Sequence, residues 1–480
     1  MTPIAVGATF AAYIMVLLGV AWYSARKARN SDYFIAGRQV RWQMAAMAMV
    51  AAAMSGITFV SVPGSVAADS FSYMQMTLGF TVGQGVIAFV LIPLFYRLRV
   101  VSLYQYLDER FGATSHKCGA WLFFISKVTI AALRIYIMCT VMQLLLFDHY
   151  HIPFGVNALF TVAVVWWATR KGGVKSLIWT DSLKTLCLVS SLVLSILFIS
   201  SSLGWGFFES VSHIFESSYS RIFFFDDPSS PYYFWKMFFA GVFSLVAMTG
   251  LDQDMMQCNL SCVNRRHAQI NIMVTALCQI FVILLFLILG VLLYIYADHN
   301  AIELPAKSDQ LFSLIAVNGG LPVIVGVLFI LGLSSSTLSS AASSLTALTT
   351  SFTVDLLRGE QRYAEEKLTK VRHAVHTSLA LVIVLLIMFV GEVSDQSVIN
   401  TLFKFVGYTY GPILGMFAFG ILTRYKIHDA LLPVVAVLSL TISIVGEWVL
   451  MHYCGYKTGF ELLIYNASIT ILGMFLIRRR

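Results

Sequence analysis

The sequence predicts an all-α protein that crosses a membrane many times, because its hydropathy is high, its charges are few and its apolar runs are long. Of its 480 residues, 58% are hydrophobic and 12% are charged. Soluble domains have about 45–50% apolar and about 25% charged residues. The mean hydropathy is +0.80, and no long polar segment separates the apolar runs. We therefore expect one transmembrane domain over residues 1–480.

A membrane-spanning helix needs about 20 residues, and thirteen apolar runs approach or exceed this length. They cover residues 4–24, 42–67, 72–96, 118–147, 153–169, 177–202, 233–257, 268–297, 321–353, 371–391, 400–423, 427–450 and 459–477. The first basic residues, Arg26 and Lys27, follow the first run. This order is typical of an uncleaved span whose beginning lies outside, and not of a signal peptide.

The positions of the basic residues predict the orientation. With the N-terminus outside, most of the 32 Lys and Arg residues fall in segments that would face the cytoplasm, as the positive-inside rule requires. The outside loops hold few of them, namely Arg221, Lys307 and Lys457. The C-terminus is then cytoplasmic. The net charge of +8 is thus a topology signal, and we expect no nucleic-acid partner.

Two of the runs contain residues that interrupt a helix. Ser55-Gly56 and Pro63-Gly64 break the run 42–67. In lipid, a broken helix is tolerated only where protein or a polar cavity satisfies the freed backbone groups. The alternative is that glycine, which is common in membrane helices, lets helices pack closely.

A second interruption, Thr249-Gly250, lies in the run 233–257. The two interrupted runs are five spans apart, so they cross the membrane in opposite directions. This predicts an inverted repeat of two five-span units, 42–202 and 233–423, the arrangement of many secondary transporters. An extra helix, 4–24, precedes the repeats, and two C-terminal helices, 427–477, follow them.

A serine-rich face lies on the ninth run. Ser336, Ser339, Ser340 and Ser343 occupy one side of a helix. Hydroxyl and carbonyl oxygens suit a hard cation, and unwound carbonyls before the Ser55-Gly56 break are expected to complete a Na⁺ site. The alternative is a serine zipper, in which small residues let two helices approach closely.

These motifs resemble, in the same order along the chain, those of the sodium:solute symporter family and its bacterial members. The matching segments are "DYFIAGR" at 32–38, "SLYQYLDERFG" at 102–112, "GGVKSLIWTDSLKT" at 172–185, "GLDQDMMQ" at 250–257, "SSSTLSSAASSLTALTTSFTVDL" at 334–356 and "YTYGPILGMFAFGILT" at 408–423. The resemblance implies a leucine-transporter-like fold of 13 transmembrane helices. It also implies a monomer in a bacterial inner membrane, without enzymatic activity or cofactor, that uses Na⁺ as coupling ion.

The resemblance assigns the main sodium site to five residues. They are the backbone carbonyls of Ala51, Met54 and Ser336 and the hydroxyls of Ser339 and Ser340.

Some members of the family have a second sodium site. Its ligands match Asp181, Ser339, Ser340 and Ser343, with Ala342 where a further serine can stand. Lys184 takes the place of the family's usual glutamine. Because Lys184 follows Asp181 by three residues, the two side chains share a helix face and are expected to pair. An ammonium there competes with a second Na⁺, so we expect one Na⁺ per cycle.

The solute site is expected around Arg134. It lies on a stretch that resembles sialic-acid transporters of this family, in which an arginine holds the substrate carboxylate, and the guanidinium fork suits a carboxylate. The alternatives are an arginine that extends to the membrane surface or a structural pair with Asp181 or Asp252. The other substrate candidates are Ser55, Thr58, Gln75 and Thr249.

The expected function is Na⁺-coupled import of a small organic solute by alternating access. The solute is an organic anion, such as sialic acid or another carboxylate, or a sugar. Ala247, Met248 and Thr249 replace the aromatic residues of sugar-binding members, which disfavours a hexose. A proton-coupled transporter of the same fold stays open, as does an ion channel, although no charged ring or filter loop is visible.

Two further acids, Asp252 and Asp254, follow the second break. They are expected on the cytoplasmic side, either solvated or paired with Arg265 or Arg266.

Overall fold

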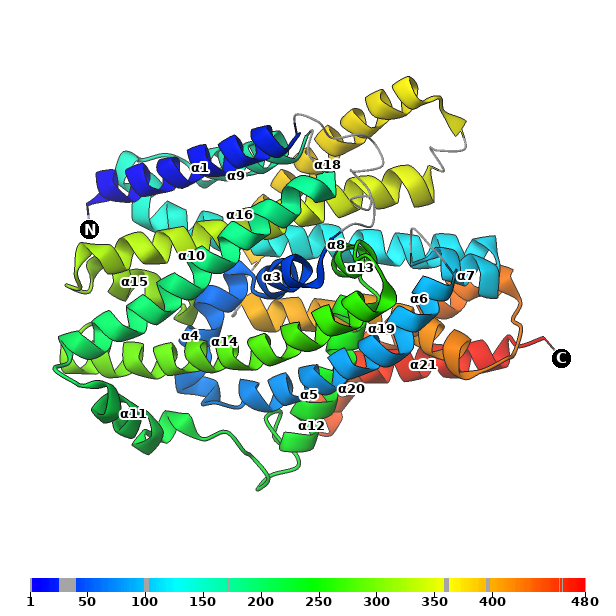
Figure 1. Cartoon of the computed structure of the whole chain (residues 1–480). Helices are drawn as coiled ribbons and strands as arrows, with labels where there is room; N and C mark the ends of the chain where they lie inside the picture. The colour runs from blue at the N-terminus through cyan, green and yellow to red at the C-terminus, as the bar shows by residue number, and fades with distance from the viewer. Residues whose placement is uncertain are drawn as a thin grey trace.

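The computed structural model describes residues 2–25, 40–98, 103–170, 173–357, 362–393, 398–456, 458–459 and 461–479. This part of the chain is helical, and its only β-type contacts are two isolated bridges, Val40–Cys262 and Ile427–Arg478. Figure 1 shows the long helices running side by side, with the N-terminus at one end of the bundle and the C-terminus at the other. The predicted motif at 32–38 lies outside the described residues.

The first half of the chain supplies the helices that precede the large loop near residue 220. They are α1 (Pro3–Ala25), α3 (Trp42–Ala53), α4 (Gly56–Asp69), α5 (Tyr73–Val86), η2 (Ile87–Leu91), α6 (Ile92–Leu98), α7 (Gln105–Arg110), α8 (Ala113–Met142), η3 (Gln143–Phe147), η4 (Asp148–Tyr150), α9 (Phe154–Thr169), α10 (Gly173–Ser202), α11 (Phe207–Glu216) and η5 (Ser218–Ser220).

The second half begins with another interrupted helix. Its elements are α12 (Phe234–Leu245), η6 (Val246–Gly250), α13 (Gln253–Leu260), α14 (Arg265–His299), η7 (Ser308–Gln310), α15 (Leu311–Asn318), α16 (Val323–Ser351), η8 (Phe352–Leu356), α18 (Glu365–Val393), α19 (Val398–Leu422), η9 (Asp429–Leu431), α20 (Leu432–Tyr453) and α21 (Leu462–Leu476).

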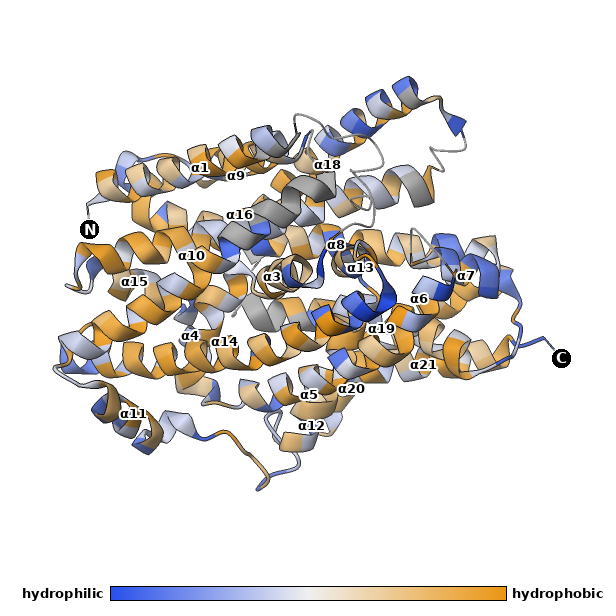
Figure 2. Ribbon diagram, in the orientation of Figure 1, coloured by the Kyte–Doolittle hydropathy of each residue, from blue (hydrophilic) through white to orange (hydrophobic). Residues whose placement is uncertain are grey.

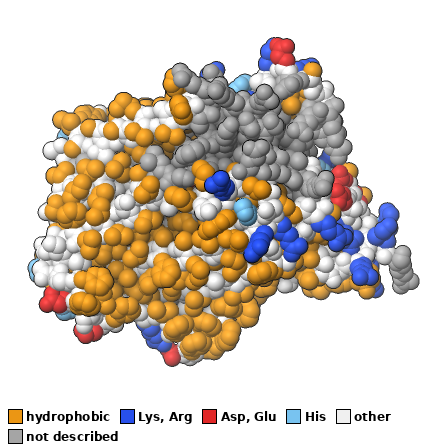
Figure 3. Space-filling view, viewed as in Figure 1, with side chains coloured by type: hydrophobic (Ala, Val, Ile, Leu, Met, Phe, Trp, Pro, Cys, Tyr) orange, Lys and Arg blue, Asp and Glu red, His pale blue; other side chains and the backbone are white. Residues whose placement is uncertain are grey.

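The outer surface of the bundle is apolar, as a protein that faces lipid requires. Hydrophobic residues run along the helices, and hydrophilic ones gather at the helix ends and in the interior (Figure 2). On the face seen in Figure 3, Lys and Arg gather toward the end of the molecule that carries the C-terminus. Large side chains such as Phe89 and Leu385 are exposed by 67% each, which in a membrane is contact with lipid.

The helices agree with the predicted spans in position. Nine helical segments of the described part are long and apolar enough to cross a membrane, and two bent pairs of helices pass the same test. Each remaining predicted span falls on a shorter helix, α9 with 16 residues or α21 with 15 residues. Because both are shorter than the about 20 residues of a typical span, the number of thirteen stays a prediction.

Both predicted interruptions are confirmed, with one correction. The axes of α3 and α4 differ by 55°, and the second pair, which ends in α13, is bent by 68°. The predicted break at Pro63-Gly64 is wrong, because α4 continues through both residues to Asp69. Gly64 instead allows a close approach: a Cβ atom on it would lie 2.3 Å from the carbonyl oxygen of Ser308. This glycine therefore serves helix packing.

The half-helices α3 and α13 are joined through their backbones at the ends that lie away from the breaks. Val40, just before α3, donates to the carbonyl of Ser261 (3.1 Å), and its carbonyl accepts from the N–H of Val263 (3.3 Å). These bonds link the two interrupted helices at the end away from their breaks.

The serine-rich helix α16 lies at the centre of the bundle. It packs against α8, α10 and α18, and nearly all of its residues from Gly332 to Ser351 are buried. In Figure 1, α10 and α16 lie beside each other across the middle of the molecule. The hydroxyl groups thus face other helices rather than lipid.

Candidate functional site

The break between α3 and α4 lies directly against α16. Met54 is extended (φ −97°, ψ 96°) and ends α3, and Ser55 begins α4 by accepting a hydrogen bond from the N–H of Thr58 (3.4 Å). A Cβ atom on Gly56 would lie 2.0 Å from Thr337 Oγ1 on α16. Only glycine lets the backbone come so close. The structure therefore brings the unwound segment and the serine-rich helix together, as the predicted Na⁺ site requires.

All the predicted sodium ligands in this region are buried. Ala51 and Met54 are each 1% exposed, and Ser336, Ser339 and Ser340 are at most 3% exposed. Ser336 donates its hydroxyl proton to the carbonyl of Leu333 (3.0 Å), within the helix. This bond involves the Ser336 hydroxyl and not the backbone carbonyl, which is the predicted ligand.

Asp181 and Lys184 are close enough for their charges to attract each other, but they form no hydrogen-bonded pair, which corrects the prediction. Their side chains extend from α10 across to α16, where each meets a serine. Ser339 donates to Asp181 Oδ1, and Lys184 donates from Nζ to Ser340 Oγ at 2.9 Å. Two adjacent hydroxyls on α16 offer a donor to the acid and an acceptor to the base. This explains why both side chains reach over instead of folding onto their own helix.

The acids after the second break have a partner that the sequence did not indicate. Lys127 of α8 lies 2.9 Å from Asp252 and 2.9 Å from Asp254. Tyr410 of α19 donates to Asp252 (2.7 Å). The predicted partners of these acids, Arg265 and Arg266 or solvent, are therefore wrong: Asp252 is only 3% exposed, and a buried carboxylate needs a buried cation.

One more contact ties this cluster to the predicted sodium region. Ser343 of α16 donates its hydroxyl proton to Asp254 Oδ1. The serine face of α16 thus bonds to α10 through Ser339 and Ser340 and to α13 through Ser343. A lysine inside a predicted span and two acids inside another were the available signal for the Lys127 cluster, but nothing in the sequence paired them.

Arg134 is buried without a partner for its Nε atom. Its side chain is 8% exposed, and among the described residues no group bonds to Nε. Both carboxylates suggested as structural partners bond elsewhere, Asp181 to Ser339 and Asp252 to Lys127. A side chain so deeply buried does not extend to the membrane surface either. The structure therefore leaves a guanidinium with spare hydrogen-bonding capacity inside the bundle.

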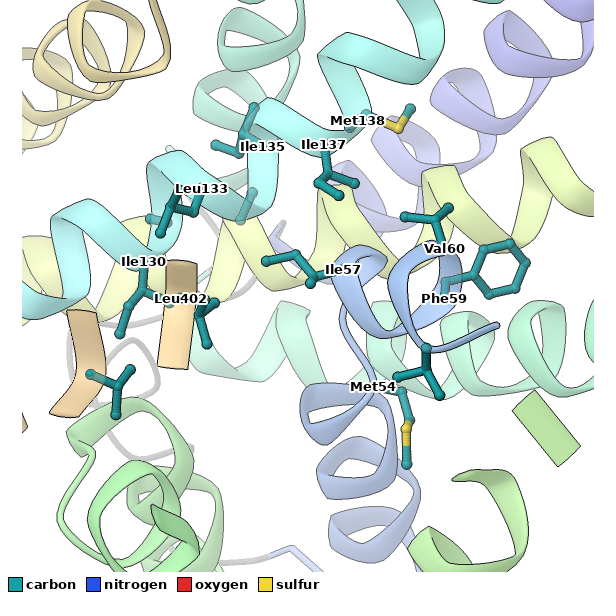
Figure 4. Close-up of a cluster of buried hydrophobic side chains, with 14 of the residues drawn as sticks. Met54, Ile57, Phe59, Val60, Ile130, Leu133, Ile135, Ile137, Met138 and Leu402 are labelled. Atoms are coloured by element: carbon teal, nitrogen blue, oxygen red, sulfur yellow. The ribbon is translucent and has the colours of Figure 1, made fainter. Parts of the chain in front are cut away.

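Arg134 lies among both apolar and charged residues. Leu133 and Ile135 on α8 and Ile57 at the start of α4 are buried, and Asp254 and Lys184 are close enough for their charges to interact with the guanidinium. Figure 4 shows Ile57 pointing away from α4 toward α8, where Leu133 and Ile137 lie. Burial strengthens the attraction between a guanidinium and an anion, because little water competes.

The remaining substrate candidates separate into two groups. Ser55 and Thr58 lie at the first break and Thr249 lies in η6 at the second, where it is 8% exposed. Gln75, in contrast, is fully occupied by the loop before α12: it donates to the carbonyl of Tyr232 (2.9 Å) and accepts from the N–H of Phe224 (3.1 Å). Its amide therefore fastens a loop.

A family model matches most of this helical bundle. The model of the sodium:solute symporter family aligns with residues 33–472. The chain belongs to the sodium:solute symporter family. Among curated members, mouse (Mus musculus) sodium-coupled monocarboxylate transporter 1 is 26% identical over 409 residues, covering 82% of this chain and 65% of that protein. The human sodium/iodide cotransporter is 25% identical over 427 residues, covering 86% and 64%.

This family member spans about two thirds of the length of those relatives. Its fold matches that of a substrate-bound, outward-open Na⁺-coupled sialic acid symporter with a TM-score of 0.82 at 20% identity, covering 98% of this chain and 97% of the other. Mhp1, a nucleobase-cation-symport-1 family transporter, matches with a TM-score of 0.55 at 12% identity over 94% and 95% of the chains. The chain therefore has the all-α, leucine-transporter-like fold of a multi-pass membrane protein. The proteins of its family and those in these two structures are transporters, not enzymes.

Proposed function

We propose that this family member is a Na⁺-coupled symporter that imports a small organic anion. The observation that carries this proposal is the contact of the α3–α4 break with α16 at Thr337. The buried Arg134 is close enough to act on the charge of Lys184, which bonds to Ser340 of α16. The named relatives are transporters of monocarboxylates and of iodide, and the similar structure is that of a sialic acid symporter. All these solutes are anions, which favours an acid over a sugar.

Na⁺ binds from the outside between the break and α16. Its ligands are the backbone carbonyls of Ala51, Met54 and Ser336 and the hydroxyls of Ser339 and Ser340. A monovalent ion that neutral oxygens hold leaves again when the inner side opens. Because the ion joins two separate elements, it fixes the unwound segment. The fixed segment completes the solute site.

The solute binds near Arg134, with the guanidinium as the partner of its carboxylate. The rest of the solute is bound by hydroxyl groups at the two breaks, those of Ser55, Thr58 and Thr249. In this proposal the N-terminus lies outside a bacterial inner membrane, the C-terminus is cytoplasmic and the chain acts as a monomer.

The ion gradient is the source of energy. Moving one charge through about 100 mV supplies about 2.3 kcal/mol, and a tenfold Na⁺ gradient supplies about 1.4 kcal/mol. One Na⁺ and one monoanion move no net charge together, so only the concentration term remains. Accumulation then reaches about tenfold for a tenfold Na⁺ gradient.

Uptake into proteoliposomes that contain the purified chain tests the proposal. Radiolabelled lactate, N-acetylneuraminate and glucose are offered at fixed pH in NaCl or in choline chloride. We expect uptake of at least one of the two acids in NaCl only. Equal uptake in choline chloride contradicts Na⁺ coupling, and uptake that follows an imposed pH gradient instead supports the proton-coupled alternative.

Replacing Arg134 tests the solute site. We expect Arg134→Gln to weaken the apparent affinity for the acid by roughly 10- to 100-fold, because a hydrogen bond to a charged group contributes about 1.5–3 kcal/mol. Arg134→Lys keeps the charge but loses the planar fork, so its affinity for the acid should lie between those of the wild type and Arg134→Gln. Uptake kinetics measure the effect, and Na⁺ binding without solute is the control. An unchanged affinity in Arg134→Gln means that Arg134 does not bind the solute.

A further inference from the structure

Lys184 places a buried positive charge inside the region expected to bind cations. Its side chain is 0% exposed, and its Nζ atom lies 2.9 Å from Ser340 Oγ. Lysine side chains are almost never fully buried unless they are paired. The charged groups close enough to act on Lys184 are Asp181 and Asp254, which attract it, and Arg134, which repels it.

The contacts around Lys184 leave too few free lone pairs for a second sodium ion. That site would use Asp181, Ser339, Ser340 and Ser343, of which Ser339 and Ser340 also serve the main site. Ser340 accepts one hydrogen bond from Lys184, so its remaining lone pair is enough for the main Na⁺ only. Asp181 accepts from Ser339, Ser340 accepts from Lys184, and Ser343 donates to Asp254. Ala342, where a further ligand would stand, carries no oxygen on its side chain. The residues therefore do not fit a second Na⁺.

We propose that Lys184 is a built-in replacement for the second Na⁺, so that each chain binds a single Na⁺. The ammonium bridges α10 and α16 through Ser340, as an ion shared by the two helices would. This inference rests on the proposed function and sets its stoichiometry. Transport of a monoanion by this chain is then electrically silent.

The number of Na⁺ ions bound by the purified full-length chain tests the inference without knowledge of the solute. Equilibrium binding of radioactive Na⁺ is measured in choline chloride for the wild type, Lys184→Gln, and Lys184→Gln combined with Ala342→Ser. We expect one ion per wild-type chain and two in at least one of the variants. Lys184→Arg, which keeps a positive charge, is the matched control and should bind one.

The outcomes separate the two proposals. A wild-type chain that binds no Na⁺ contradicts the proposed function. A wild-type chain that binds two, or Lys184→Gln variants that both bind only one, overturns the inference about Lys184 and leaves Na⁺ coupling intact. Size-exclusion profiles and melting temperatures show whether each variant is folded. If the variants do not fold, the number of Na⁺ ions bound by the wild type still tests the inference. Two ions per wild-type chain would exclude that Lys184 replaces the second Na⁺.

Discussion

Replacing Ser339 and Ser340 together by alanine is expected to abolish Na⁺-dependent uptake. The two hydroxyls supply two of the five proposed ligands, and each ligand to a charged group contributes about 1.5–3 kcal/mol. The loss therefore lowers Na⁺ affinity by more than about 100-fold. Asp181 and Lys184 lose their partners on α16 together, so the double variant removes the bonds of one acid and one base and leaves the net charge unchanged.

Uptake as a function of Na⁺ concentration measures this effect, and a matched double variant controls for it. Ser335 and Ser344 are also fully buried hydroxyls of α16. Among the described residues, Ser335 bonds only to Gly332 within the helix and Ser344 has no hydrogen-bond partner. Ser335→Ala with Ser344→Ala should keep the Na⁺ dependence of the wild type. If both double variants behave alike, the hydroxyl face is a packing feature and not an ion site.

Replacing Lys127 by methionine is expected to destabilise the chain by about 3–5 kcal/mol, the usual effect of removing one partner of a buried ion pair. Lys127 is 1% exposed and is the cation that lies between Asp252 and Asp254. Without it, the donors that the described residues offer to the two carboxylates are hydroxyl and backbone N–H groups: Tyr410 and two N–H groups to Asp252, and Ser343 to Asp254. Because the cluster joins α8, α13 and α19, the loss should affect the whole bundle.

Thermal unfolding in detergent measures the effect of Lys127→Met. Lys370→Met removes a lysine from an exposed pair with Glu366 and should change the stability by less than about 1 kcal/mol. Adding Asp252→Asn and Asp254→Asn to Lys127→Met removes the buried negative charges and should recover part of the stability. A Lys127→Met variant as stable as the wild type shows that the acids are neutral or solvated in solution.

Much of the fold follows from hydrophobic runs and from the residues that interrupt them. The bends after Met54 and at Gly250 are where the sequence indicates them, because glycine and serine in the middle of an apolar run need a reason other than lipid contact. The prediction was wrong at Pro63, since proline and glycine also occur inside packed helices. Sequence alone does not separate a break from a close approach.

The polar contacts within the bundle were harder to predict than the helices. Lys127 and Asp252 are 125 positions apart in the sequence, and only the packing of α8 against neighbouring helices brings them together. Asp181 and Lys184 illustrate the opposite error, in which a local rule suggested a pair and two serines on another helix offered a better one. The ion and solute ligands stay predictions, because hydroxyls and carbonyls also bond within the helices that carry them.

The backbone connection at Val40 has a mechanical consequence. Val40 exchanges hydrogen bonds with Ser261 and Val263, so the ends of the two half-helices that lie away from the breaks are tied to each other. Each half-helix is joined to its other half through a bend. A conformational change that opens this side of the protein therefore moves α3 and α13 together, as one rigid body that rotates at the two bends. Otherwise it has to break the hydrogen bonds at Val40 first.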